Sequence, residues 1–298
     1  MKYRILGSTG LKVSVVGVGT WQFGGEWGGP FAQETVDALF EEARACEINL
    51  IDTAECYGDH ESERLIGKAV ERDRAKWVIA TKVGHKFHAN FERTEPRSPA
   101  DLVEQTETSL KCLRTDYVDI QQYHSWGDDT FFDQDALATL LKLKDQGKIR
   151  HIGNSIGSNQ NVKQTAASKD FSVEVIQLIY NRLDRVPQTT TLPVCTQLNL
   201  GVLARVPLAS GFLSGKYKPG HVFDAGEVRG KWHKAEDRDN TLREVERIAR
   251  EEVPPGADMA SWALAWCLQN PAVTSVIPGC KSAAQVRSNA NAIKLMQA

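Results

Sequence analysis

The chain has 298 residues, of which 41% are hydrophobic, a length that suits one large domain or two ordinary ones. Its net charge of −2 gives no electrostatic reason to expect a nucleic acid or an anionic membrane as partner. No apolar run approaches the ~20 residues that cross a bilayer, and the first ten residues lack the pattern of a secretory signal. The six cysteines are scattered without a C-x-x-C pair, so we expect reduced thiols and a cytoplasmic protein.

The chain begins with a predicted β-hairpin, residues 3–6 and 11–14 around a turn at residues 7–10. Short apolar runs typical of buried strands follow it. They cover residues 15–18, 49–51, 77–81, 117–123, 149–153, 173–180, 201–206 and 273–277. Amphipathic segments between them, such as 35–45, 62–71, 101–113 and 135–147, are typical of helices. Ser98 and Pro99 are typical of a helix start, and Gly147 of a helix end.

Eight strand candidates that alternate with helices predict an α/β fold with a parallel sheet. A closed (β/α)8 TIM barrel with an N-terminal β-hairpin suits the strand count and the length, and a doubly wound open sheet is the alternative. No linker-like stretch divides the chain, so we expect a single domain over residues 1–298. Residues 210–237 form the longest irregular stretch, which we expect to lie as a long loop over the C-terminal rim of the barrel.

Polar side chains stand where three successive apolar runs end: Asp52, Lys82 and His124. Tyr57 lies one short loop beyond Asp52. Because the carboxyl ends of parallel strands meet at one rim, where barrel active sites form, we expect these four side chains to converge. Each residue alone has an ordinary structural explanation, such as a helix cap or a solvated charge. Their joint placement favours a catalytic site.

The four residue types suit the reduction of a carbonyl group. A tyrosine hydroxyl, with a pKa of about 10, is a weak acid near neutrality unless its anion is stabilised. Lys82 would favour the Tyr57 phenolate, and Asp52 would keep that lysine charged and oriented. His124 would donate a hydrogen bond to the carbonyl oxygen and so orient the substrate.

The sequence resembles the aldo-keto reductase family over nearly its whole length. The resemblance rests on NLIDTAECYGDHESERLIGKAV (49–70), ATKVG (80–84) and QQYHSW (121–126), then IRHIGNS, VIQLIYN, PLASGFLSGKY and SVIPGCKS in the family's order. It implies a (β/α)8 barrel with a hairpin across its bottom. The family's catalytic tetrad corresponds to Asp52, Tyr57, Lys82 and His124 without substitution.

The resemblance also implies a nicotinamide dinucleotide, usually NADPH, extended across the rim without a Rossmann domain. Gly17 and Gly19 begin like G-x-G-x-x-G, but Gln22 occupies the third glycine position. The cofactor contacts implied near the nicotinamide are Gly19, Thr20, Trp21, Asp52, Ser155, Gln177 and Arg205. Those implied along the pyrophosphate and beyond are Pro207, Leu208, Ser210, Gly211, Leu213, Gly215, Lys216, Gly279, Lys281, Ser282, Gln285 and Asn289.

Two positions depart from the family's pattern. Ser155 is followed by Ile156 where an asparagine is common, so one carboxamide hydrogen bond is either lost or supplied by Asn154. Arg205 stands where many members carry a tyrosine that stacks on the nicotinamide. We hypothesise that the planar guanidinium lies on the ring instead. A salt bridge at the rim is the alternative.

The last helix start carries Lys281 and Ser282, a setting that suits a dianionic phosphate. We therefore expect NADPH to be preferred over NADH. For the substrate we expect a small carbonyl compound or alcohol, held by Trp21, Tyr57, His124 and Trp126, with Trp27 and Trp232 in segments near the rim.

Metal binding is not predicted. His85 and His88 are three residues apart, but no carboxylate or cysteine follows at a recognisable ligand spacing.

The sequence thus predicts an NADPH-dependent oxidoreductase that reduces an aldehyde or ketone, or runs the reverse reaction. As an alternative, potassium-channel β subunits share the fold and serve chiefly as cofactor-sensing partners. A non-redox barrel isomerase is a weaker alternative. We expect no nucleic-acid or membrane partner and a monomer or small homo-oligomer. The sequence leaves the substrate, the direction of the reaction and the oligomeric state open.

Overall fold

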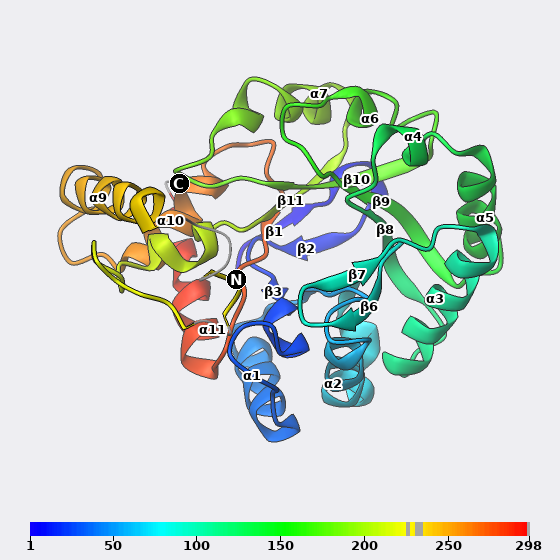
Figure 1. Cartoon of the computed structure of the whole chain (residues 1–298), viewed down its shortest axis with the longest axis horizontal. Helices are drawn as coiled ribbons and strands as arrows, with labels where there is room; N and C mark the ends of the chain where they lie inside the picture. The colour runs from blue at the N-terminus through cyan, green and yellow to red at the C-terminus, as the bar shows by residue number, and fades with distance from the viewer. Residues whose placement is uncertain (225–226, 230–234, 297–298) are drawn as a thin grey trace.

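An eight-stranded parallel barrel forms the centre of the computed structural model, which describes residues 1–224, 227–229 and 235–296 (Figure 1). Its strands, in order, are β3 (Val18–Gly19), β4 (Leu50–Asp52), β5 (Val78–Val83), β8 (Val118–His124), β9 (Ile149–Ser155), β10 (Val173–Ile179), β11 (Gly201–Arg205) and β12 (Ser275–Val276). Parallel bridges Val16–Val276 and Gly19–Gly279 join the first strand to the last and close the sheet. The predicted closed barrel is confirmed, and each strand overlaps one of the eight apolar runs.

Helices surround the barrel and connect its strands. They are α1 (Gln33–Ala45), α2 (Glu61–Val70), α3 (Pro99–Cys112), α4 (Asp128–Phe131), α5 (Gln134–Asp145), α6 (Lys163–Ala166), α7 (Thr191–Leu198), α9 (Ala235–Glu251), α10 (Met259–Leu268) and α11 (Ala283–Ala290). Ser98 Oγ accepts a 3.2 Å hydrogen bond from the Asp101 amide and so caps α3. Gly147 follows α5 at φ 75°, a left-handed conformation that glycine adopts without strain. Both predicted helix boundaries are confirmed.

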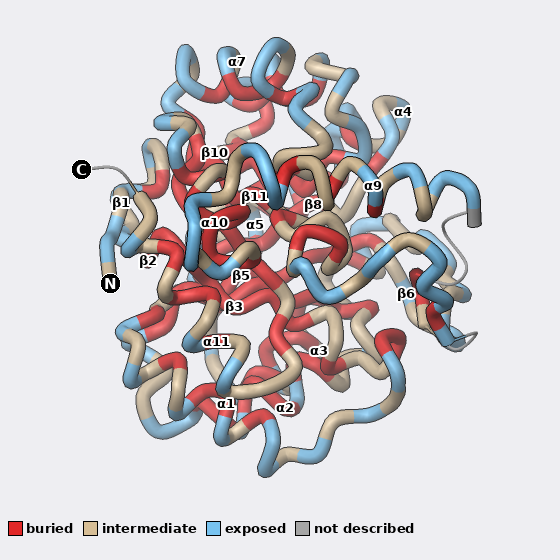
Figure 2. The backbone as a smooth tube through the Cα atoms, turned by 90° about the vertical axis from the view of Figure 1, so that its left-hand side faces the viewer, coloured by how far each residue is buried: buried red, intermediate tan, exposed pale blue. Residues whose placement is uncertain are grey.

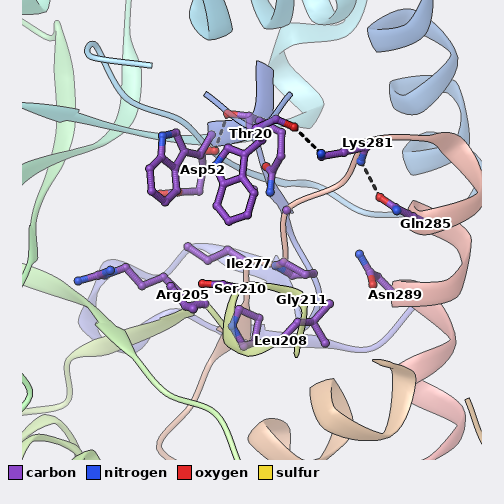
Figure 3. Close-up of a pocket in the computed structure, with 18 of the residues that line it drawn as sticks. Thr20, Asp52, Arg205, Leu208, Ser210, Gly211, Ile277, Lys281, Gln285 and Asn289 are labelled. Atoms are coloured by element: carbon purple, nitrogen blue, oxygen red, sulfur yellow. Dashed lines mark hydrogen bonds between the residues drawn. The ribbon is translucent and has the colours of Figure 1, made fainter. Parts of the chain in front are cut away.

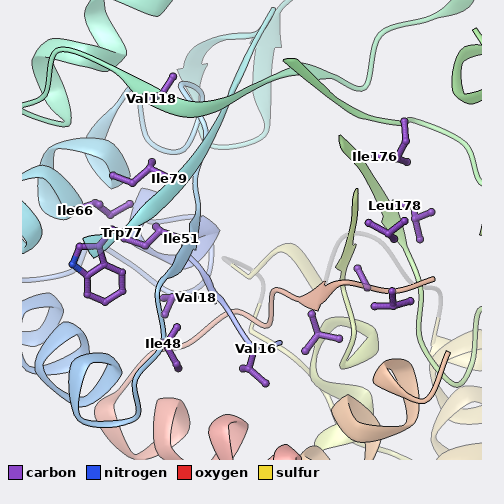
Figure 4. Packing of buried hydrophobic residues seen from close by; sticks show 14 of the residues in the cluster. Val16, Val18, Ile48, Ile51, Ile66, Trp77, Ile79, Val118, Ile176 and Leu178 are labelled. Atoms are coloured by element: carbon purple, nitrogen blue, oxygen red, sulfur yellow. The ribbon is translucent and has the colours of Figure 1, made fainter. Parts of the chain in front are cut away.

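The main core lies between the strands and the surrounding helices. Figure 2 shows buried residues concentrated along the strands, and Figure 4 shows Ile51, Ile79 and Val118 pointing into this layer. All three are 0% exposed. Burying each such side chain stabilises the fold by about 1.5–3 kcal/mol, because apolar surface leaves water.

The N-terminal hairpin closes the bottom of the barrel. Its strands β1 (Tyr3–Ile5) and β2 (Lys12–Ser14) are antiparallel. Leu6, which follows β1, is fully buried and packs with the inward-facing Leu50, Val78 and Ile120. Gly201 lets Leu6 approach closely, since an added Cβ there would lie 2.5 Å from Leu6 Cγ. The C-terminal rim is therefore the open end.

Two connections extend over that rim. One joins β11 to β12 and carries the 3-10 helix η5 (Ala209–Ser214) and α9 (Ala235–Glu251). The stretch predicted to be irregular, residues 210–237, lies in this connection; its ends are helical, and residues 225–226 and 230–234 lie outside the described residues. The other is a hairpin that the sequence analysis did not predict, β6 (Lys86–Ala89) with β7 (Glu92–Thr94). No helix in the described part of the chain combines the length and apolar character needed to cross a bilayer.

Candidate active site

Three of the four expected catalytic side chains meet directly at the C-terminal rim. Lys82 Nζ lies 3.0 Å from each carboxylate oxygen of Asp52. It also donates hydrogen bonds to the Thr53 carbonyl at 2.7 Å and to the Tyr57 hydroxyl at 3.2 Å. Asp52 ends β4 and Lys82 lies near the end of the adjacent β5, so the parallel pairing of these strands brings them together.

His124 completes the group from the end of β8. Its ring meets the Tyr57 ring edge-on, with centroids 6.2 Å apart. Its Nδ1 lies 3.3 Å from Glu55 Oε1 and 3.7 Å from Cys56 Sγ. Trp21 stacks beside Tyr57 with centroids 6.0 Å apart. The phenol therefore lies between an imidazole, an ammonium and an aromatic wall.

Burial and charge fix the protonation of this group. Burial raises the pKa of Tyr57 to about 12, although the charge of Lys82 acts in the opposite direction. The expected stabilisation of the phenolate by Lys82 is thus present but outweighed by desolvation. Burial alone would lower the pKa of Lys82, but the charge of Asp52 and the contact with Tyr57 raise it above its usual value. Tyr57 therefore keeps its proton at neutral pH, next to a charged lysine.

His124 is held neutral. Burial first, then the positive charges of Lys82 and Arg205, lower the pKa of His124 well below its usual value. A neutral imidazole has one N–H donor and one acceptor nitrogen. The site therefore offers a neutral phenol and a neutral imidazole to a substrate.

A cavity of about 710 Å³ extends from these residues to the start of α11 (Figure 3). Most of the residues that the resemblance implied for the cofactor line it. They are Gly19, Thr20, Trp21, Asp52, Ser155, Gln177, Arg205, Pro207, Leu208, Ser210, Gly211, Lys216, Gly279, Lys281, Ser282, Gln285 and Asn289.

Two expected cofactor residues do not line the cavity. Leu213 is fully buried in an apolar cluster with Phe212 and Leu242, because η5 directs its side chain away from the cavity. Gly215 lies against Met259, where an added Cβ would be 3.4 Å from the Met259 side chain. The expectation that these two residues border the pyrophosphate is not met by this arrangement.

Polar side chains form a connected layer at the floor of the cavity. Gln177 Nε2 donates to Asp52 Oδ1 at 2.6 Å, and Ser155 Oγ donates to Gln177 Oε1 at 3.3 Å. Asn154 does not join them: alternation along β9 turns it away from the cavity, and its Nδ2 donates to Gln164 at 2.9 Å. Asn154 is therefore not placed to replace the asparagine that is common in the family at the position of Ile156.

Arg205 lies at the end of β11 with its guanidinium at the cavity wall. Its Nη2 donates to the Ile156 carbonyl at 3.2 Å. Within the described residues its Nε has no hydrogen-bond partner, and the nearby carboxylate of Asp52 pairs with Lys82 instead. The alternative of a rim salt bridge therefore has no support in this structure.

The far end of the cavity is rich in positive charge. Lys216, Arg229 and Lys281 all line it, and burial lowers the pKa of Lys281. Lys281 also lies 3.9 Å from Glu227. Ser282 caps α11 by accepting from the Gln285 amide at 3.3 Å. Arg229 also pairs with Glu227, so that carboxylate offsets part of the positive charge. Lys216, Lys281 and the helix N-terminus fit the phosphate groups of a dinucleotide, so the residues present suit the implied cofactor.

Further residues that line the cavity are Cys56, His85, Arg93 and Arg229. The sequence analysis identified neither Arg93 nor Arg229. Arg93 lies on β7 of the hairpin that the sequence did not predict. The polar, exposed residues of this hairpin lack the apolar alternation that is typical of a strand. No local pattern indicates its approach to the rim.

A buried carboxylate, Glu26, ties this hairpin to the rim. It is 0% exposed and accepts hydrogen bonds from Trp21 Nε1 at 2.5 Å, the Phe91 amide at 2.9 Å and Arg93 Nη2 at 2.6 Å. Glu26 stands in the glycine-rich GGEWGG, which gave no sign of a buried acid. It fixes Trp21 beside Tyr57.

Of the tryptophans expected near the substrate, some line the cavity and others do not. Trp21 and Trp27 line the cavity, whereas Trp126 does not. Trp126 is 2% exposed, donates from Nε1 to the Val83 carbonyl at 3.1 Å and packs against Tyr123. This strand-end residue packs in the core and lines a smaller neighbouring pocket, so the arrangement gives no support to the expectation that Trp126 contacts the substrate. Trp232 lies outside the described residues.

The model of the Aldo/keto reductase family matches residues 15–297. NADH-specific methylglyoxal reductase of Escherichia coli (strain K12) is 30% identical over 99% of this chain and 94% of its own length. A probable voltage-gated potassium channel subunit beta of Arabidopsis thaliana is 29% identical over 99% of this chain and 92% of its own length. Among solved structures, aldo-keto reductase AKR11C1 from Bacillus halodurans is 28% identical with a TM-score of 0.82, covering 99% of this chain and 91% of its own. The chain is a member of the aldo/keto reductase family of oxidoreductases.

Proposed function

We propose that this protein reduces a small aldehyde or ketone to an alcohol, or catalyses the reverse reaction, with NADPH and with Tyr57 as proton donor. The observation that carries the proposal is the Tyr57 hydroxyl, 3.2 Å from Lys82 Nζ at the floor of a cavity that fits a dinucleotide. The carbonyl reductase named among the relatives supports the same reaction type.

Reduction needs a hydride on carbon and a proton on oxygen. When bound, the nicotinamide supplies the hydride. Tyr57 gives its proton to the carbonyl oxygen, and the charge of Lys82 stabilises the phenolate that remains. Asp52 and the Thr53 carbonyl hold the ammonium in place for this task. His124 orients the carbonyl by a hydrogen bond.

We further propose a preference for NADPH over NADH. Support comes from Lys216 and Lys281 at the far end of the cavity, because a 2′-phosphate adds negative charge there. Arg229 also lines this end, where it pairs with Glu227. Since one relative is named as NADH-specific, both cofactors belong in the test.

The test is a substrate panel with each cofactor in turn. Methylglyoxal, 4-nitrobenzaldehyde and simple ketones are mixed with the protein, and loss of the reduced-nicotinamide absorbance is followed. We expect steady turnover with at least one small aldehyde and a higher kcat/KM with NADPH. Cofactor binding is followed by tryptophan quenching. If the cofactor binds but no substrate is turned over, the proposal that the protein is an enzyme is refuted, and a cofactor-sensing subunit is favoured. Equal or better kcat/KM with NADH would refute the preference.

A further inference from the structure

Arg205 stands at the reacting end of the cavity, away from the end that suits phosphates. It lines the cavity together with Tyr57 and His124. Figure 3 shows Arg205 and Asp52 at one end of this cavity and Lys281 at the other. Arg205 is close enough to interact electrostatically with Tyr57 and Asp52, and its charge is one of those that lower the pKa of His124. A group bound beside Tyr57 therefore lies in the electric field of this guanidinium.

The guanidinium of Arg205 is charged, and the hydrogen bond that it donates goes to a neutral group. Its Nη2 donates to the main-chain carbonyl of Ile156 at 3.2 Å, and its Nε is buried without a hydrogen-bond partner among the described residues. Although burial lowers the pKa of Arg205, a guanidinium keeps its proton in proteins. A positive charge therefore borders the reacting end of the cavity.

The other cations near His124 are balanced by carboxylates. Each of the three has an acidic partner, and the pairs are Lys82 with Asp52 at 3.0 Å, Arg93 with Glu26 at 2.6 Å and Arg97 with Glu95 at 2.8 Å. Burial raises the pKa of the Glu55 carboxyl and so favours its neutral form. Arg205 therefore supplies the excess positive charge at this end of the cavity.

The two redox states of a nicotinamide differ by one charge on the ring. The reduced dihydropyridine ring is neutral, and the oxidised pyridinium ring carries one positive charge. Hydride reaches the carbon of a carbonyl group whose oxygen takes the proton of Tyr57, so the ring has to lie next to Tyr57, at the end that Arg205 borders. A cation repels the oxidised ring and not the reduced one, and burial limits the screening of this repulsion by salt.

We propose that Arg205 makes the protein bind the reduced nicotinamide cofactor more tightly than the oxidised form, so that at equal concentrations it carries mainly the reduced form. The inference rests on the proposed function, which assigns the nicotinamide to this cavity, and adds the redox state that the chain selects. The equilibrium of the reaction in solution is unchanged. What the charge alters is occupancy: the protein is loaded for reduction, and the oxidised cofactor inhibits it weakly.

Direct binding tests the bias without any substrate. Full-length protein is titrated with NADPH, tryptophan quenching is recorded, and NADP⁺ is measured by its displacement of NADPH. We expect Kd for NADP⁺ to exceed Kd for NADPH in the parent by at least about tenfold, equivalent to about 1.4 kcal/mol. NAD⁺ and NADH should show the same bias, because they carry the same ring. Equal Kd values for the two redox states in the parent would overturn the inference.

Variants separate the charge of Arg205 from its packing. Arg205→Gln, which keeps an N–H donor for the Ile156 carbonyl, should lower the ratio of Kd for NADP⁺ to Kd for NADPH by about tenfold. Arg205→Lys, which keeps the charge without the planar group, should hold the ratio within about threefold of the parent even if both Kd values rise. Arg205→Met replaces Arg205→Gln if the latter fails to fold by circular dichroism. An unchanged ratio in the neutral variant would overturn the role of Arg205.

Lys216→Gln is the matched control. It removes one positive charge from the same cavity, but at the end that suits the phosphates, which are the same in both redox states. Both Kd values should rise together, with their ratio within about twofold of the parent. A ratio that falls as far as in Arg205→Gln would show that any charge in the cavity produces the bias, and would overturn the assignment to Arg205.

Product inhibition gives a second measurement on any substrate that is turned over. Relative to Kd for NADPH, the inhibition constant of NADP⁺ should be about tenfold lower in Arg205→Gln than in the parent. Cofactor binding with an unchanged ratio would overturn this inference alone. Absence of turnover with any substrate would refute the proposed function and leave the binding ratio standing, whereas absence of binding of either redox state would refute both.

Discussion

The ammonium of Lys281 donates a hydrogen bond to the main-chain carbonyl of Trp27 (Figure 3). This bond joins the segment before α11 to the loop after β3, two parts of the chain that border the same cavity. Lys281 is therefore fixed at the cavity end where positive side chains gather.

Lys281→Ala should raise KM for NADPH by about tenfold, equivalent to about 1.4 kcal/mol of lost charge-assisted contact, and leave KM for NADH within about twofold. Arg287→Ala is the matched control. Arg287 lies further along α11 and pairs with Glu42 of α1 at 2.6 Å, so we expect no change with either cofactor. Steady-state kinetics with both cofactors decides the matter. An equal loss with NADPH and NADH would contradict a 2′-phosphate contact.

Asp119→Ala should lower the free energy of unfolding by about 3 kcal/mol, because it leaves buried donors unpaired. Asp119 is 2% exposed and accepts from Arg74 at 2.8 Å, Arg150 at 3.1 Å and the Ile79 amide at 3.0 Å. Urea denaturation of the variant and of the exposed control Asp116→Ala measures the difference. The control should stay within about 0.5 kcal/mol of the parent. Similar losses in both would show that the network contributes little.

Asp73→Asn should reduce stability at neutral pH and not in acid. Two hydrogen bonds from Arg44, at 2.9 and 2.8 Å, lower the pKa of Asp73 below its usual value. The folded state therefore binds fewer protons here than the unfolded chain, whose pKa is about 3.9. The stabilisation is complete above about pH 5 and disappears as pH falls through the lowered folded value.

At neutral pH, urea denaturation should give the parent a free energy of unfolding about 1 kcal/mol higher than that of Asp73→Asn. This value is reduced because the contact is partly exposed to solvent. The gap should shrink steadily between about pH 5 and pH 3. A gap that stays constant over this range would mean that the contact does not depend on the charge of Asp73.

The barrel was predictable because its strands are buried on both faces and therefore read as continuous apolar runs. The convergence of Asp52, Lys82 and His124 followed from their common place at strand ends. Side-chain direction beyond a strand was not predictable: Trp126 turns into the core and Leu213 into a separate cluster.

Long-range polar contacts were also hidden. Glu26 and Arg93 meet across 67 positions through a hairpin of exposed residues, which leaves no periodic pattern in the sequence. The side chains that surround His124, namely Glu55, Cys56 and His85, come together in the same way, from the loops after β4 and β5. Such sites depend on loop geometry, which composition and spacing do not encode.

The central claim is that the Tyr57 phenol delivers the proton, and Tyr57→Phe removes only its oxygen. The decisive measurement is kcat for aldehyde reduction by this variant, with NADPH binding followed in parallel by tryptophan quenching. We predict that kcat falls by a factor of about 10²–10⁴, the usual contribution of a positioned acid, while NADPH affinity stays within about twofold. Turnover within about threefold of the parent, with cofactor binding intact, would contradict the account.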